Sequence, residues 1–115
     1  MVNDRKEYPA GTTIIRQGAA DRCFYILEKG AVEVVKDGVV LNVLMYPGTI
    51  FGEIGSILGK PRTSSIKART ATTVICYENI DPGELVREYP EIAAKMLETL
   101  ASRLDRTTQK LADSL

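Results

Sequence analysis

One stretch of the sequence gathers side chains that could bind a small anion. Residues 51–65 read FGEIGSILGKPRTSS, and they place an arginine, Arg62, beside two hydroxyl residues, Thr63 and Ser64. A guanidinium is a planar fork that suits two phosphate oxygens, and the hydroxyls and backbone N–H groups beside it add donors. Gly52 has no side chain, so it would let the backbone come close to a ligand. These residue types predict a phosphate site.

Glu53 does not fit a site for phosphate alone. A short helix beginning near Glu53 would turn free backbone N–H groups toward a phosphate, but the carboxylate itself would repel one. It is useful if it accepts a hydrogen bond from a neighbouring hydroxyl, such as a ribose 2′-OH. A phosphate and a free 2′-OH on one compact sugar describe a 3′,5′-cyclic nucleotide. The predicted ligand-binding positions of this stretch are Gly52, Glu53, Ile54, Arg62, Thr63 and Ser64.

Each of these residues has a simpler explanation when it is taken alone. Arg62 follows a proline and could be a solvated turn arginine. Glu53 could be a carboxylate that the helix dipole favours near an N-terminus, and Gly52 could serve only a turn. The whole set at this spacing, after about five strand-like segments, favours the ligand site.

The stretch resembles the phosphate-binding cassette of the cyclic nucleotide-binding domain family, whose pattern is roughly F-G-E-[LI]-[AG]-L, a short spacer and P-R-[TSA]-A. The resemblance extends along nearly the whole chain, with further matches in family order at Gly18, residues 24–26, Gly30 and Gly48. It implies a mainly β fold with flanking helices, namely an eight-stranded β-roll (a double-stranded β-helix or jelly roll) and a long C-terminal helix.

The resemblance also implies a role for each cassette residue. Glu53 would hold the ribose 2′-OH and Arg62 the cyclic phosphate, while Gly52 and the backbone at the two following hydroxyl residues complete the pocket. Two positions depart from the pattern. Ser56 stands where leucine or alanine is usual, and Ser64 replaces the common alanine. Both departures bear on affinity more than on binding itself.

The first two thirds of the chain has the pattern of short strands separated by turns. The β-rich segments are residues 12–16, 23–29, 31–36, 39–45, 64–71 and 72–77. Asp37 and Gly38 between two of them are a strong hairpin signal. We therefore predict one domain over residues 1–115, with a β-roll over about residues 10–80 and helices over about residues 82–115.

The last third changes its period. From Glu91 onward there is no glycine or proline, and leucines recur at three-, four- and seven-residue steps, as expected of an amphipathic helix. The stripe of leucines could dock on the β-roll, or it could pair with the same helix of a second copy of the chain. The helix resembles the dimerisation helix of bacterial catabolite-activator-type regulators, in which a Thr-Ser pair reaches the adenine. That resemblance implies a homodimer and assigns Thr107 and Thr108 to the ligand.

The choice of base has two interpretations. Thr63, directly after the arginine, could hydrogen-bond a guanine amino group and favour cGMP, as the family resemblance implies, or it could merely help bind phosphate. Hydroxyls on the apolar edge of a helix are costly to bury unpaired, which favours a ligand role for Thr107 and Thr108. We therefore expect cAMP rather than cGMP.

Composition excludes several classes of function. Lys plus Arg and Asp plus Glu number 15 each, so the chain lacks the basic field of a nucleic-acid-binding module. Histidine is absent, which removes the commonest general base and metal ligand. Cys23 and Cys76 could form one disulfide, but two reduced thiols in a cytosolic protein are favoured. No apolar run is long enough to cross a membrane, so we expect a cytoplasmic domain without membrane insertion.

We therefore predict a regulatory domain that is not an enzyme and has neither catalytic residues, metal nor cofactor. Its ligand would be cAMP or cGMP, and its C-terminal helix would signal to a partner or output domain outside this chain. One alternative is a degenerate β-roll that dimerises but binds no nucleotide; the presence of Glu53 and Arg62 argues against it. Another is a cupin-like enzyme, which needs clustered metal ligands.

Overall fold

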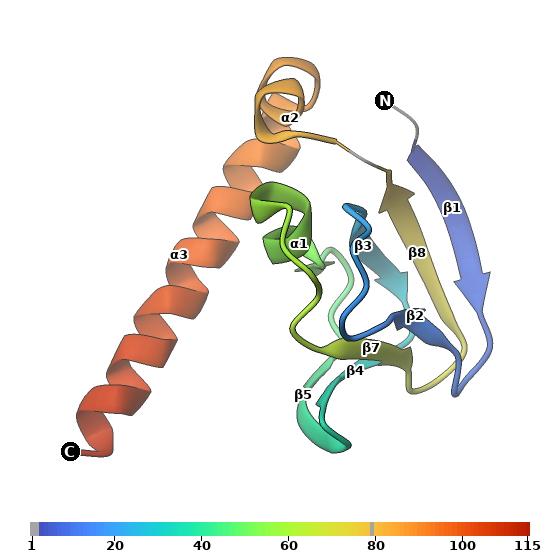
Figure 1. The fold of residues 1–115 in the computed structure, drawn as a ribbon. Coiled ribbons are helices and arrows are strands. Elements are labelled where there is room, and N and C mark those ends of the chain that lie inside the picture. Colours follow the sequence, from blue (N-terminus) through green and yellow to red (C-terminus); the bar gives the residue numbers. More distant parts are fainter. Residues whose placement is uncertain (1–2, 79) are drawn as a thin grey trace. The chain divides into compact units, whose positions relative to one another are not determined.

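The computed structural model describes residues 3–78 and 80–115, and the chain divides into two compact units, Met1–Asp81 and Pro82–Leu115. The first unit holds eight strands and one short helix, and the second holds two helices (Figure 1). The elements are β1 Asn3–Tyr8, β2 Thr13–Ile15, β3 Phe24–Lys29, β4 Val32–Lys36, β5 Val39–Leu44, β6 Ile50–Phe51, α1 Glu53–Leu58, β7 Ser65–Ala68, β8 Thr72–Tyr77, α2 Pro82–Glu88 and α3 Pro90–Asp113.

The strands form two antiparallel sheets of four. One has the order β1-β8-β3-β6 and the other β2-β7-β4-β5. Strands that neighbour each other in the chain are often separated in space, so each sheet combines early and late parts of the first unit. The predicted eight-stranded β-roll is confirmed.

Side chains from both sheets make the core. Alternation along the strands turns one face of each sheet inward, and the buried residues that contact one another are Ile15, Tyr25, Leu27, Val32, Phe51, Ile66, Val74 and Cys76. The rings of Tyr25 and Phe51 stack with their centroids 5.1 Å apart. This contact joins β3 to β6, so Phe51, the residue before the cassette glycine, is fixed by the core.

The first strand differs from the prediction. β1 begins at Asn3, ahead of the predicted start of the roll near residue 10, and pairs along its length with β8. Its sequence, NDRKEY, carries charges rather than the β-branched and aromatic residues that signal a strand. Because it lies at the edge of its sheet, it needs little apolar surface, and charged side chains suit an edge.

The second unit consists of α2 and α3, which contact each other. Pro90 occupies the first turn of α3, where proline is tolerated, and α3 spans 24 residues in all, Pro90–Asp113. Three leucines spaced seven residues apart, Leu97, Leu104 and Leu111, are 70%, 68% and 64% exposed. The long amphipathic helix is therefore confirmed, and its leucine stripe is not covered by α2. Among the described residues, no helix is long and apolar enough to span a membrane.

A glycine between β3 and β4 gives a test of the roll. Gly30 has φ +90°, and an added Cβ would lie 2.9 Å from Thr72 Cα and closer still to the Ala71 carbonyl oxygen. Gly38 in the β4–β5 hairpin has φ +80° but open space around it. Gly30→Ala should lower the free energy of unfolding by about 3 kcal/mol, through backbone strain plus overpacking. Gly38→Ala should lower it by about 1 kcal/mol through strain alone. Urea denaturation measures both, and equal losses would contradict the crowding at Gly30.

Candidate functional site

The predicted cassette helix forms as a single short element between two glycines. β6 ends at Phe51, and Gly52 then adopts φ 81° at the N-cap of α1. The helix ends at Leu58, and its C-cap is Gly59, whose φ of 64° is also left-handed and whose N–H donates to the Gly55 carbonyl at 2.9 Å. Glycine adopts this conformation without the strain that a Cβ brings. The two reversals set where α1 begins and ends.

Arg62 lies buried beside α1, with its side chain only 4% exposed. The guanidinium donates from Nη2 to Asp21 Oδ2 at 2.8 Å and from Nε to Asp21 Oδ1 at 3.4 Å. Nη1 donates to the Gly52 carbonyl at 2.6 Å, and Nη2 also donates to the Cys23 carbonyl. These bonds use four of the five N–H donors of a guanidinium. Arg62 is therefore a pre-oriented cation, and a solvated turn arginine is ruled out.

The backbone of Arg62 is held by the same loop as its side chain. Its N–H donates to the Ala19 carbonyl and its carbonyl accepts from the Gly18 N–H, both at 2.8 Å. Residues 18–23, which we call the β2–β3 loop, thus clasp Arg62 through both its peptide and its guanidinium. This loop positions the arginine as directly as the cassette does.

Asp21 is the residue that sequence reasoning missed. The hydrogen bond from Arg62 holds the pKa of the Asp21 carboxyl below its usual value, and the charge of the arginine adds to the shift although partial burial opposes it. The two residues are 41 positions apart, and no motif links them. The only available signal was physical, because a buried arginine needs an anionic partner.

The surroundings of Gly55 explain why the cassette pattern has a small residue at this position. A Cβ at this position would lie 2.9 Å from Arg62 Cζ and closer still to Nη1. The guanidinium therefore rests against the backbone of α1 at a place where any side chain would displace it. In the sequence, this glycine stands out only as part of the family pattern.

The remaining predicted cassette residues differ in exposure. Glu53 is 3% exposed in the first turn of α1, whereas Ile54 beside it is 53% exposed. Thr63 is exposed and Ser64 is half-buried, directly after Arg62 in the chain. The structure thus brings Gly52 into contact with Arg62, with Glu53 next in sequence, and leaves Thr63 at the surface.

Two polar contacts connect α1 to other parts of the roll. Arg22 donates to the Ser56 carbonyl through Nη2 at 3.0 Å and Nε at 3.3 Å. The Ser56 hydroxyl, 2% exposed, donates to the Ile80 carbonyl at 3.4 Å. The departure from the family pattern at Ser56 therefore supplies a hydrogen bond to the chain just before the second unit.

Thr107 and Thr108 lie on α3, in the second unit, and both are exposed. The Thr107 hydroxyl donates to the Arg103 carbonyl at 2.9 Å, within its own helix. This bond satisfies the hydroxyl without a ligand, so the cost of burying it unpaired no longer favours a ligand role. Their assignment to the ligand stays a prediction.

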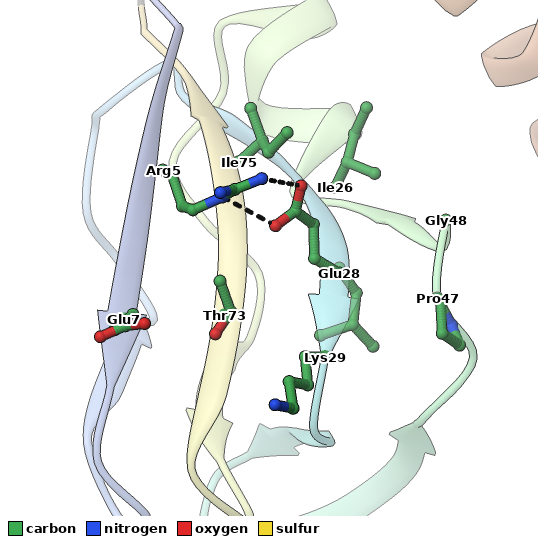
Figure 2. A pocket seen from close by; sticks show the side chains of 10 residues that line it. Arg5, Glu7, Ile26, Glu28, Lys29, Pro47, Gly48, Thr73 and Ile75 are labelled. Atoms are coloured by element: carbon green, nitrogen blue, oxygen red, sulfur yellow. Dashed lines mark hydrogen bonds and ion pairs between the residues drawn. The ribbon is translucent and has the colours of Figure 1, made fainter.

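A separate groove of about 610 Å³ lies on the face of the β1-β8-β3-β6 sheet that points away from the core (Figure 2). Arg5 reaches across it to Glu28, with Nε and Oε2 2.9 Å apart. None of its lining residues belongs to the cassette. It is open and carries both charge signs, and we assign it no role. Across residues 3–78 and 80–115, no group of three or more acidic or cysteine side chains could hold a metal ion.

Comparison with known proteins gives consistent results. The family described as "Cyclic nucleotide-binding domain" matches residues 5–89. A cAMP-dependent protein kinase regulatory subunit from Aspergillus niger is 43% identical over 72 residues, covering 62% of this chain and 18% of the relative. A CRP-like cAMP-activated global transcriptional regulator from Mycobacterium tuberculosis is 32% identical over 111 residues, covering 93% of this chain and 50% of the relative.

Solved structures agree with the sequence relatives. The crystal structure of Thermus thermophilus catabolite activator protein superposes with a TM-score of 0.82 at 28% identity, covering 96% of this chain and 54% of that one. The chain thus spans half or less of the length of both curated relatives described above. The family match covers most of the chain, including α1, Arg62 and the β2–β3 loop that holds it. This chain belongs to the cyclic nucleotide-binding domain family.

Proposed function

We propose that this chain is a regulatory domain that binds a cyclic nucleotide, cAMP in preference to cGMP, at the cassette around Arg62. Occupancy would be reported through the C-terminal helix to a partner or output domain outside the chain. The domain would act without catalysing a reaction, and we assign it to the cytoplasm. There, thiols such as Cys23 and Cys76 stay mostly reduced.

The observation that carries the proposal is the buried, pre-oriented Arg62. Asp21 and two backbone carbonyls fix its plane, and one Nη1 N–H remains for an anion. A donor already held in place loses little freedom when the ligand arrives, so more of the interaction appears as affinity. Partial exclusion of water strengthens the attraction to a phosphate oxygen. A cyclic phosphodiester carries a single negative charge, and Arg62 is the one arginine in residues 51–65.

Glu53 supports the ribose half of the proposal. It is a buried carboxylate one residue after Gly52, whose carbonyl accepts from Arg62. A sugar whose phosphate meets Arg62 would therefore present its neighbouring 2′-OH near Glu53. A hydrogen bond from a hydroxyl to a buried carboxylate is among the stronger ones.

The preference for cAMP is supported by the names of the relatives, two of which are described as cAMP-dependent and cAMP-activated. We propose that Thr107 and Thr108 meet the base, in line with the resemblance of α3 to a dimerisation helix. The competing arrangement is selection of cGMP by the hydroxyl of Thr63, which is exposed. Titration with both nucleotides decides between them.

The exposed leucine stripe supports pairing of α3 with a second copy of the chain. Leucines at seven-residue spacing form the seam of paired helices, and about three heptads make a weak pair. In this arrangement the Ser56–Ile80 hydrogen bond joins the cassette to the chain entering α2 and α3. Ligand binding at the cassette would then shift the equilibrium between unpaired and paired α3 helices.

The first test of the proposal concerns Arg62. Arg62→Ala should weaken cAMP binding by about 30-fold or more, because removing one partner of a desolvated charge pair costs on the order of 2–5 kcal/mol. Arg62→Lys should also lose affinity, since an ammonium cannot reproduce the fork. Isothermal titration calorimetry measures both.

The matched control is Arg69→Ala, because Arg69 is an exposed arginine of the roll that pairs with Glu33 and lies outside both the cassette and the β2–β3 loop. Its affinity should stay within about threefold of the wild type, a margin of under 1 kcal/mol. Circular dichroism establishes that each variant is folded. Unchanged affinity in folded Arg62→Ala would remove Arg62 from the site.

The second test concerns Glu53. Wild-type protein should bind 2′-deoxy-cAMP roughly tenfold more weakly than cAMP, because a hydrogen bond to a charged group is lost. Glu53→Gln should narrow that difference, and Glu33→Gln on β4 is the control that should keep it. Equal affinities of wild type for the two ligands would show that Glu53 does not read the ribose.

The third test concerns α3. cAMP should raise the dimer fraction in analytical ultracentrifugation, because a ligand that binds the dimer better shifts the equilibrium toward it. Thr107→Ala with Thr108→Ala should abolish this effect and weaken cAMP binding more than cGMP binding. Ser102→Ala on the same helix is the control. A monomer at every concentration, with and without ligand, would refute pairing, and an unchanged cAMP preference in the double variant would favour Thr63.

A further inference from the structure

Two thiols approach each other inside the roll. Cys76 lies on β8 and is fully buried, and Cys23, half-buried, directly precedes β3. In the register of the two strands Tyr25 faces Cys76 and Phe24 faces Tyr77. Cys23 is two residues before Tyr25, so alternation turns it toward the same face of the sheet, diagonal to Cys76. Both thiols belong to or pack against one core cluster.

The surroundings of the two thiols give them different roles. Burial raises the pKa of the Cys76 thiol to about 11, and the nearby Cys23 contributes through charge and a side-chain hydrogen bond, although Lys6 opposes the shift. Cys76 is therefore a neutral thiol near pH 7. Cys23 is the more exposed of the two, so a reagent from solution reaches it first.

We propose that Cys23 and Cys76 form a reversible disulfide, a modification site that weakens nucleotide binding by displacing an acceptor of Arg62. Whether the disulfide forms depends on the geometry of the two strands and not on the proposed function. Its effect on affinity rests on the proposed function.

The chemistry needs a small disulfide as oxidant, such as oxidised glutathione. The Cys23 thiolate attacks one of its sulfurs, forming a mixed disulfide and releasing one small thiolate. Cys76 then gives its proton to solvent and attacks Cys23 Sγ, releasing the second small thiolate. Two protein thiols are oxidised to one disulfide, and the small disulfide is reduced to two thiols. The buried, protonated state of Cys76 makes the second step the slower one.

The link to the site runs through the backbone of Cys23. Its carbonyl accepts a hydrogen bond from Arg62 Nη2, so it is one of the three groups that hold the guanidinium. Diagonal neighbours on antiparallel strands are about 7–8 Å apart, whereas a disulfide needs Cα atoms within about 7 Å. Closing the bond therefore draws residue 23 toward β8 and its carbonyl away from Arg62. Arg62 keeps its hydrogen bonds to Asp21, but without the Cys23 carbonyl its guanidinium is held less firmly in its orientation.

The test begins with the thiols alone. The folded chain is incubated with oxidised glutathione, and free thiols are counted before and after by mass spectrometry of the alkylated protein. We expect two free thiols to fall to none in a monomeric chain, and dithiothreitol to restore them. Cys23→Ser and Cys76→Ala should form no internal bridge. Failure of the wild type to bridge without denaturant, or a bridge only between chains, would overturn the proposal.

Titration with cAMP then measures the effect on the site. Oxidised wild type should bind roughly tenfold more weakly than reduced protein, as expected for the loss of one hydrogen bond to a charged group, and reduction should restore the affinity. A bridged protein with unchanged affinity would overturn the link to Arg62. Reduced protein that binds neither cAMP nor cGMP would instead refute the proposed function, and the thiol count would still decide whether the bridge forms.

Discussion

Burial of one positive charge organises this site. A guanidinium removed from water must find acceptors for its N–H groups and an anion for its charge. Arg62 finds them in Asp21 and in the carbonyls of Gly52 and Cys23. The acceptors come from the cassette and from the β2–β3 loop, so these two segments must meet. The sheets accomplish this by pairing β3 with β6 and β2 with β7.

The arginine also constrains the two cassette glycines whose backbone lies beside its guanidinium. Gly55 must lack a side chain because the guanidinium lies against its backbone. Gly52 must reverse the chain between Phe51, which the core fixes by stacking on Tyr25, and α1. A cassette pattern that looks like a ligand signature is thus also a packing requirement of the fold. This dual role explains why the pattern predicts the local geometry well.

How much the sequence predicts depends on whether the signal is local. The hairpin at Asp37 and Gly38, α1 and the long helix α3 follow from turn chemistry, cassette pattern and leucine spacing within a few residues. β1 was not predicted, because its charged residues become a strand only through pairing with β8. β6 has two residues, too few to show a period. Asp21 could not be predicted, because only the folded roll brings it to Arg62.

The separation of 41 residues between Asp21 and Arg62 has a kinetic consequence. Contacts between distant segments form late, since the loop between them must close first. The site therefore does not exist in a nascent or partly folded chain, however complete its cassette sequence. Only molecules that have closed both sheets bring Asp21 to Arg62. A complete set of Arg62 contacts is therefore itself a sign that the roll has folded.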